Sequence, residues 1–194
     1  MRRRSFTDQP LLDEQGNPSP AAAVAAERRW WDFETIAPTP RDKLSLSLIF
    51  AGLALFLPTV WLLVLTDNPS SKPYFTPHAP LNALAISCFV LGIVPVQPPT
   101  PGAVLRAERL SAHQAWLLGL GIPAMLVGTG FMWYNKENNG AEHYTTWHAW
   151  FGCLTLTWAL LQAAIGAGSV WAGGWVFGGG ARARSVYKYH RPDL

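Results

Sequence analysis

Four long apolar segments without charged side chains constrain the fold of this chain more than any other feature. At about 1.5 Å per residue, each is long enough to cross the roughly 30 Å hydrocarbon core of a bilayer. Soluble helices of such length carry polar stripes, which these segments lack, and only 14% of the residues are charged. We therefore predict an all-α integral membrane protein, an antiparallel transmembrane helix bundle, rather than two buried hairpins of a soluble protein. Its four spans are expected at about residues 44–65, 74–96, 110–134 and 146–171.

Basic residues are distributed unevenly between these spans, which predicts the orientation. Of the 15 Lys and Arg residues, only Lys72 and Lys136 lie in the first and third connections. The others lie in the leader, in the second connection and in the tail, so both termini are predicted to be cytoplasmic, and endomembrane, vacuolar and plasma membranes are all compatible. The net charge of +3 then reflects topology and a lipid bilayer as partner. No base-reading motif is present, so nucleic acid is not expected as a partner.

The chain divides into a leader and a membrane domain. Residues 1–43 are expected to be a mostly disordered cytoplasmic tail, with an interfacial helix as an option near AAERRWWDF. Residues 44–194 are expected to form the transmembrane domain. Within it, Pro123 is tolerable if neighbours or waters satisfy the freed carbonyl group. The glycine cluster between Gly173 and Gly180 is expected to be a flexible connection.

Four histidines stand at the mouths of apolar segments. His78, His113 and His148 open the second, third and fourth spans, and His190 stands where another would begin. An ionisable side chain at membrane depth is costly without a partner or a function, and imidazole is a common axial ligand of haem iron. The second and fourth spans run in the same direction, which places His78 with His148 on the non-cytoplasmic side and His113 with His190 near the cytoplasmic face. This pattern predicts two stacked bis-histidine haems, whereas any single histidine could equally be an interfacial hydrogen-bonding residue.

Three further residues near these histidines are candidates for a role at the same sites. Gly152, one turn after His148, would let a porphyrin approach the backbone, and Asn82, one turn after His78, could bind a propionate or another helix. His143 lies in the third connection and cannot share a helix face with His148. It is expected to be a solvated loop residue, or else a proton acceptor or substrate contact at the non-cytoplasmic mouth.

Several strings in the chain resemble the cytochrome b-561 family of transmembrane haem oxidoreductases. They are PHAPLNAL, RLSAHQAW, MWYNKENNGAEHYTTWHAWFG and VYKYHR, within residues 44–191. The resemblance implies a fold of six helices whose inner four hold two haem b groups, with His78, His148, His113 and His190 as the axial ligands. It also implies a stand-alone ascorbate-dependent oxidoreductase that reduces monodehydroascorbate or a ferric chelate on the non-cytoplasmic side, and a homodimer is compatible with it.

Basic and polar residues at the two mouths are candidates for holding these substrates by charge-assisted hydrogen bonds. Equally, basic residues at helix ends can serve only as topology signals and lipid anchors. For ascorbate at the cytoplasmic mouth the candidates are Arg106, Arg109, Lys188 and Arg191. For the anionic acceptor at the other mouth they are Lys72, Asn135, Lys136 and His143.

One departure from the family pattern affects the second haem. The match stops at KYHRPDL, where family members continue through two more spans, so the chain looks truncated. Without a fifth helix, His190 is expected to lack rigid support, and the chain is then expected to hold one haem firmly and the second weakly or not at all. Two alternatives remain for a chain that binds no haem: a membrane scaffold or partner subunit, and a proton-relay transporter.

Overall fold

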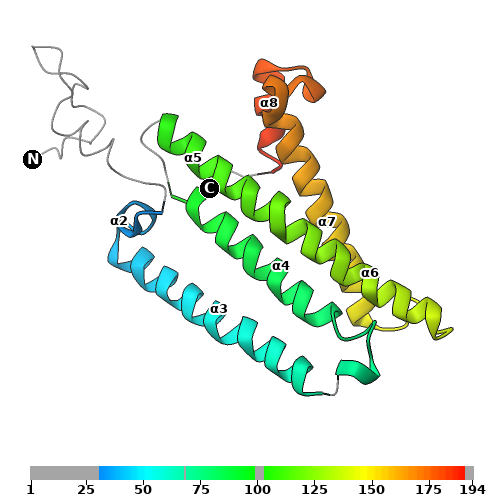
Figure 1. The fold of residues 1–194 in the computed structure, drawn as a ribbon. Helices are drawn as coiled ribbons and strands as arrows, with labels where there is room; N and C mark the ends of the chain where they lie inside the picture. Colours follow the sequence, from blue (N-terminus) through cyan, green and yellow to red (C-terminus); the bar gives the residue numbers. More distant parts are fainter. Residues whose placement is uncertain (1–30, 68, 99–102, 191–194) are drawn as a thin grey trace, which may run out of the picture.

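The computed structural model describes residues 31–67, 69–98 and 103–190, and these contain helices and turns but no strand. Four long helical stretches, Pro40–Thr66, His78–Val96, Val104–Asn138 and Trp147–Phe177, have the length and hydropathy of membrane spans. They lie side by side in chain order, alternating in direction (Figure 1). The prediction of an all-α membrane bundle with four spans is therefore confirmed. The chain is an integral, multi-pass membrane protein.

The first span, α3, covers Pro40–Thr66 and begins four residues before its predicted start. Thr39 caps it in a capping box with Asp42, which satisfies free N–H groups of the first turn. Large apolar side chains such as Leu48, Leu55 and Leu62 are exposed along it. A helix that presents apolar side chains outward suits lipid as its surroundings. The Trp61 indole ties it to α4 by donating to the Pro80 carbonyl at 3.2 Å.

The second span, α4, covers His78–Ile93 and continues as a 3₁₀ turn over Val94–Val96. It begins at the histidine itself, four residues after the predicted start at Tyr74. Buried alanines let α4 approach its neighbours closely, as small residues do in membrane helix contacts. A cluster of Ala85, Ala124 and Met125 joins α4 to α6, with Leu156 and Ala159 of α7 packed against it.

The third span is one continuous helix with an irregular middle. It consists of α5 (Ala103–Gln114), a π-helical segment (Ala115–Gly121) and α6 (Ile122–Asn138). In a regular α-helix the ring of Pro123 would clash with the carbonyl four residues earlier. Here the turn before the proline is wider, and the Ile122 N–H donates to Leu117, five residues back. The change of helix type thus makes room for the proline ring.

The fourth span, α7, covers Trp147–Val170, within one residue of its predicted limits. It ends in a tight reversal over Trp171–Phe177, after which α8 (Gly180–Tyr187) packs beside α7 (Figure 1). Gly174 has φ +75°, and a side chain there would also meet Ala183 and the Ser169 carbonyl. The expectation of a flexible glycine-rich connection is wrong, because the positive φ angles of these glycines build a defined turn that brings the chain back toward α7.

The part of the leader that the structure describes is attached to the bundle. A short helix, α2 (Phe33–Ile36), is capped by Asp32, and Lys43 forms an ion pair with Glu34. The Thr35 carbonyl accepts a hydrogen bond from Arg109 of α5 at 3.0 Å. Most of the predicted disordered tail, and most of AAERRWWDF, lie outside the described residues.

Candidate functional site

One histidine pair lies where α4 and α7 begin. His78 is the first residue of α4, and His148 is the second residue of α7. Their ring centres are 6.0 Å apart, and their planes are nearly perpendicular, at 86°. The structure thus brings together the two residues that the direction of the spans predicts to be neighbours. We call this end of the bundle the His78 end.

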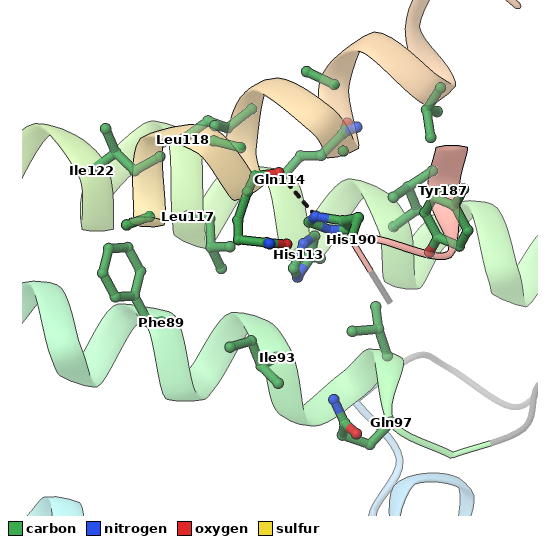
Figure 2. A pocket seen from close by; sticks show the side chains of 18 residues that line it. Phe89, Ile93, Gln97, His113, Gln114, Leu117, Leu118, Ile122, Tyr187 and His190 are labelled. Atoms are coloured by element: carbon green, nitrogen blue, oxygen red, sulfur yellow. Dashed lines mark hydrogen bonds between the residues drawn. The ribbon is translucent and has the colours of Figure 1, made fainter. Parts of the chain in front are cut away.

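The second pair lies at the other end of the bundle, which we call the His113 end. His113 comes from α5, and His190 follows α8; their ring centres are 6.1 Å apart at an interplanar angle of 74°. Both rings line an apolar cavity of about 510 Å³ (Figure 2). The other lining side chains include Phe89 and Ile93 of α4, Leu117 and Ile122 of the third span, and Tyr187 of α8.

Backbone carbonyls fix the orientation of three of the four rings. The Nδ1 atoms of His78, His113 and His190 each lie 2.9 Å from a carbonyl oxygen. A carbonyl can only accept, so Nδ1 carries the hydrogen and Nε2 keeps its lone pair. This tautomer, held by an outer hydrogen bond, is the one found for histidines that ligate a metal through Nε2. The acceptors are Gly128, Gly92 and Gln162, in that order.

A socket on α7, formed by Gln162 and Gly166, holds His190. The Gln162 carbonyl accepts from the imidazole at 2.9 Å, marked by the dashed line in Figure 2, and the Gln162 amide donates to the Tyr189 carbonyl at 3.3 Å. One turn on, a side chain at Gly166 would lie 2.7 Å from the imidazole carbon Cε1. Only a glycine leaves room for the ring. The expectation that His190 lacks support is therefore wrong, since α7 and α8 position it.

Burial also keeps the His190 ring in the state that binds metal. Loss of hydration lowers the pKa of this imidazole, the hydrogen bond to Gln162 opposes the change, and the nearby His113 lowers the pKa further. The net effect is a pKa below the ordinary value, so His190 is neutral at neutral pH. A neutral imidazole has the free lone pair that a metal ligand needs.

Both pairs fit an iron with two axial imidazoles. An imidazole nitrogen lies about 2 Å from a transition metal that it binds, and its ring centre about 1 Å further, so two rings on opposite sides of one iron have centres about 6 Å apart. The measured separations of 6.0 and 6.1 Å agree with this geometry. At the His113 end, the apolar lining of the cavity also suits a porphyrin.

The four residues predicted to bind ascorbate differ in their exposure to solvent. Arg106 and Lys188 are exposed at the His113 end, and Arg191 lies outside the described residues. Arg109 is 1% exposed and donates to the carbonyls of Thr35 and Pro98, at 3.0 and 3.3 Å. A buried charge needs such partners, and the guanidinium does not line the cavity of His113 and His190. Arg109 therefore attaches the leader to the bundle, and its prediction as a substrate ligand is not supported.

The predicted acceptor residues gather at the His78 end. Asn135, Lys136 and His143 lie at or just after the end of α6. Lys72 lies near them, because Tyr74, two residues after it, contacts Tyr134 of α6 at 4.8 Å between ring centres. Each of the four predicted residues has a polar contact with a residue close to it in the chain. Lys72 pairs with Asp67 at 2.9 Å, Lys136 donates to the Glu142 carbonyl, and the Asn135 carbonyl accepts from Asn139.

His143 is held more firmly than a solvated loop residue. Its ring stacks on Trp133, with centres 3.9 Å apart, and its Nε2 lies 2.9 Å from a carboxylate oxygen of Glu137. The ring is therefore oriented at the mouth of the bundle, next to the positive-φ residue Tyr144.

Comparison with known proteins places two of these histidines within a known family of sequences. The profile of the family described as Eukaryotic cytochrome b561 matches residues 103–189, which include His113 and His148. This segment of the chain is similar to the cytochrome b561 family. A similar curated protein, "Transmembrane reductase CYB561D2" of Bos taurus, is 32% identical over 114 residues, which cover 57% of the chain and 50% of that protein. The chain thus spans about half the length of this relative. No solved structure matches the chain.

The match to the cytochrome b561 family implies haem as the cofactor. The family match covers one histidine of each pair; His78 precedes it, and His190 follows its last residue directly. The pairing of these two with His148 and His113 therefore rests on the geometry of the structure.

Proposed function

We propose that this chain is a transmembrane reductase of the cytochrome b561 family with two haem b sites, formed by His78 with His148 and by His113 with His190. The observation that carries the proposal is the presence of two imidazole pairs with ring centres about 6 Å apart at opposite ends of one bundle. The relative from Bos taurus is named a transmembrane reductase. When bound, haem b supplies one-electron redox chemistry, and the chain supplies ligands, orientation and an apolar surrounding.

The residues around the rings have distinct roles in this proposal. The carbonyls of Gly128, Gly92 and Gln162 hold the Nδ1 hydrogens, so that each Nε2 would be free to bind iron. Asn82 supports His78 from one turn away, since its amide donates to the His78 carbonyl at 2.8 Å. At the His113 end, Phe89 and Leu117 line the cavity and exclude water.

The proposed donor is ascorbate at the cytoplasmic His113 end, and the proposed acceptor is monodehydroascorbate or a ferric chelate at the His78 end. Arg106 and Lys188 are exposed near the former and would attract the ascorbate anion. Lys136 and the oriented His143 would serve an anionic acceptor at the latter. In this role Lys136 would exchange its carbonyl partner, Glu142, for the acceptor.

An optical spectrum of the purified chain tests the proposal. We expect a b-type spectrum that is reducible by dithionite, partly reducible by ascorbate, and equivalent to about two haems per chain by the pyridine haemochrome assay. A protein that stays colourless after expression with added haem precursor, yet remains helical and monodisperse, would refute the proposal. Such a result would favour a scaffold or a proton-relay transporter.

The orientation gives a second prediction. Because 13 of the 15 basic residues lie in the leader, the second connection and the tail, tags at both termini should be cleaved by protease added to the cytosolic side of sealed vesicles. The NKENNG connection should resist until detergent is added. Cleavage of NKENNG in intact vesicles would reverse the donor and acceptor sides while leaving the haem sites as proposed.

A further inference from the structure

Two histidines and two glycines form reciprocal contacts between α4 and the third span. His78 at the start of α4 donates to Gly128 of α6, and His113 of α5 donates to Gly92 near the end of α4. Both glycines lie at points of close approach: a Cβ at Gly128 would come within 2.8 Å of the Asn82 amide, and one at Gly92 within 2.9 Å of the Trp116 Cβ. Each helix therefore supplies one ring and the acceptor of the other ring.

The two helices do not have the same number of residues between these contacts. Gly92 lies 14 positions after His78, whereas Gly128 lies 15 positions after His113. In a regular α-helix each residue turns the helix by about 100°. Fifteen positions would therefore rotate Gly128 by about 100° relative to the arrangement that 14 positions give, and His78 would lose its acceptor.

The π-helical segment lies between His113 and Gly128. All of α4 from His78 to Gly92 is regular, while Ala115–Gly121 is π-helical. A π-helical turn closes its hydrogen bond one residue later than an α-helical turn, so a single π-bulge takes up one extra residue while the helix continues on the same face beyond it. The π-helical segment therefore takes up one extra residue, which is the difference between the two spacings.

We propose that the π-helical segment Ala115–Gly121 is a register correction that keeps His113 and Gly128 on the face toward α4, so that both haem ligands are oriented at once. The proposal rests on the proposed function, because it concerns the positioning of His78 and His113. It assigns the extra residue a role beyond accommodating Pro123. Its consequence is that the spacing between His113 and Gly128, and not the identity of the residues inside the segment, determines whether both sites form.

Three length variants in a P123A background test the proposal, because removal of the proline permits either helix type. Deleting Gly119, which is exposed and has no neighbour near its Cβ position, leaves 14 positions and should give a regular helix with two haems per chain. Inserting an alanine after Gly119 gives 16 positions and should remove at least one haem. The matched control is the same insertion after Met132, beyond Gly128, which should keep both haems.

Haem stoichiometry, the low-spin electron paramagnetic resonance signals of the ferric haems and helix content by circular dichroism are the readouts. A Gly119 deletion that loses a haem or fails to fold would overturn the proposal, and so would an insertion after Gly119 that keeps both haems. If the insertion variant does not fold, the deletion still decides. Failure of the proposed function itself is distinct, since the unmodified chain and P123A alone would then bind no haem.

Discussion

Replacing His78 or His148 with alanine is expected to lower the haem content from two per chain to about one. In the proposed arrangement each variant removes one of the two imidazoles that would hold the same haem, and the remaining ring, 6.0 Å away in the intact pair, would hold it more weakly. The spans should still insert, because their apolar length is unchanged. The measurement is haem per chain with a reduced-minus-oxidised spectrum in one detergent, and the spectral component that persists should be the same in both variants.

The control for this pair is H143A. It removes an imidazole at the same end of the bundle, but this ring contacts Trp133 and Glu137 rather than His78 or His148. Its haem content should remain at about two per chain. Equal losses in H143A and H148A, or full haem content in both H78A and H148A, would contradict the assignment of the His78 end.

The second large effect is expected from G166A. A methyl group at this position would lie 2.7, 2.9 and 3.0 Å from Cε1, Nδ1 and Nε2 of His190, which is closer than a methyl carbon approaches ring atoms without repulsion. The ring must then leave its socket and lose its hydrogen bond to Gln162. We expect the haem of the His113 end to be lost or several-fold weaker in binding, with the His78 haem retained.

G52A provides the matched control, because it is the same substitution within a spanning helix, α3, at a glycine with open space around it and away from both histidine pairs. It should keep both haems, and titration of haem into the two apo-proteins compares their affinities. If G166A and G52A bind haem with the same stoichiometry and affinity, His190 is not the ligand that the socket is proposed to position.

Much of this architecture follows from the sequence. A segment that crosses a bilayer must match its thickness and must pair its backbone N–H and C=O groups internally, so that a long apolar segment has to be a helix. Apolar length predicts the four spans, and their alternating direction predicts which histidines lie at the same end. The limits of α3 and α4 were less predictable, since Thr39 and the turns before His78 depend on local capping and not on hydropathy. Tyr74, for example, is apolar enough to extend a span but precedes the helix.

The acceptors of the histidines were not predictable by the same reasoning. Gly92 and Gly128 act through backbone carbonyls on neighbouring helices, and hydropathy carries no information about register between helices. The burial of Arg109 against Thr35 is likewise a contact across 74 positions. The turn formed by the glycine cluster depends on φ angles that composition does not specify. His190 is supported because this turn brings the end of the chain back toward α7.

The reversal after α7 makes the two proposed haem sites unequal in how they would respond to heat or denaturant. At the His78 end both rings belong to the first turns of spanning helices, which are packed along the length of the bundle. At the other end, one ring, that of His190, follows the eight-residue helix α8 and depends on it for its position. A helix this short has little stability of its own and can open locally while the spans remain intact. Loss of cofactor would then be stepwise, and partial unfolding would leave a chain with one haem.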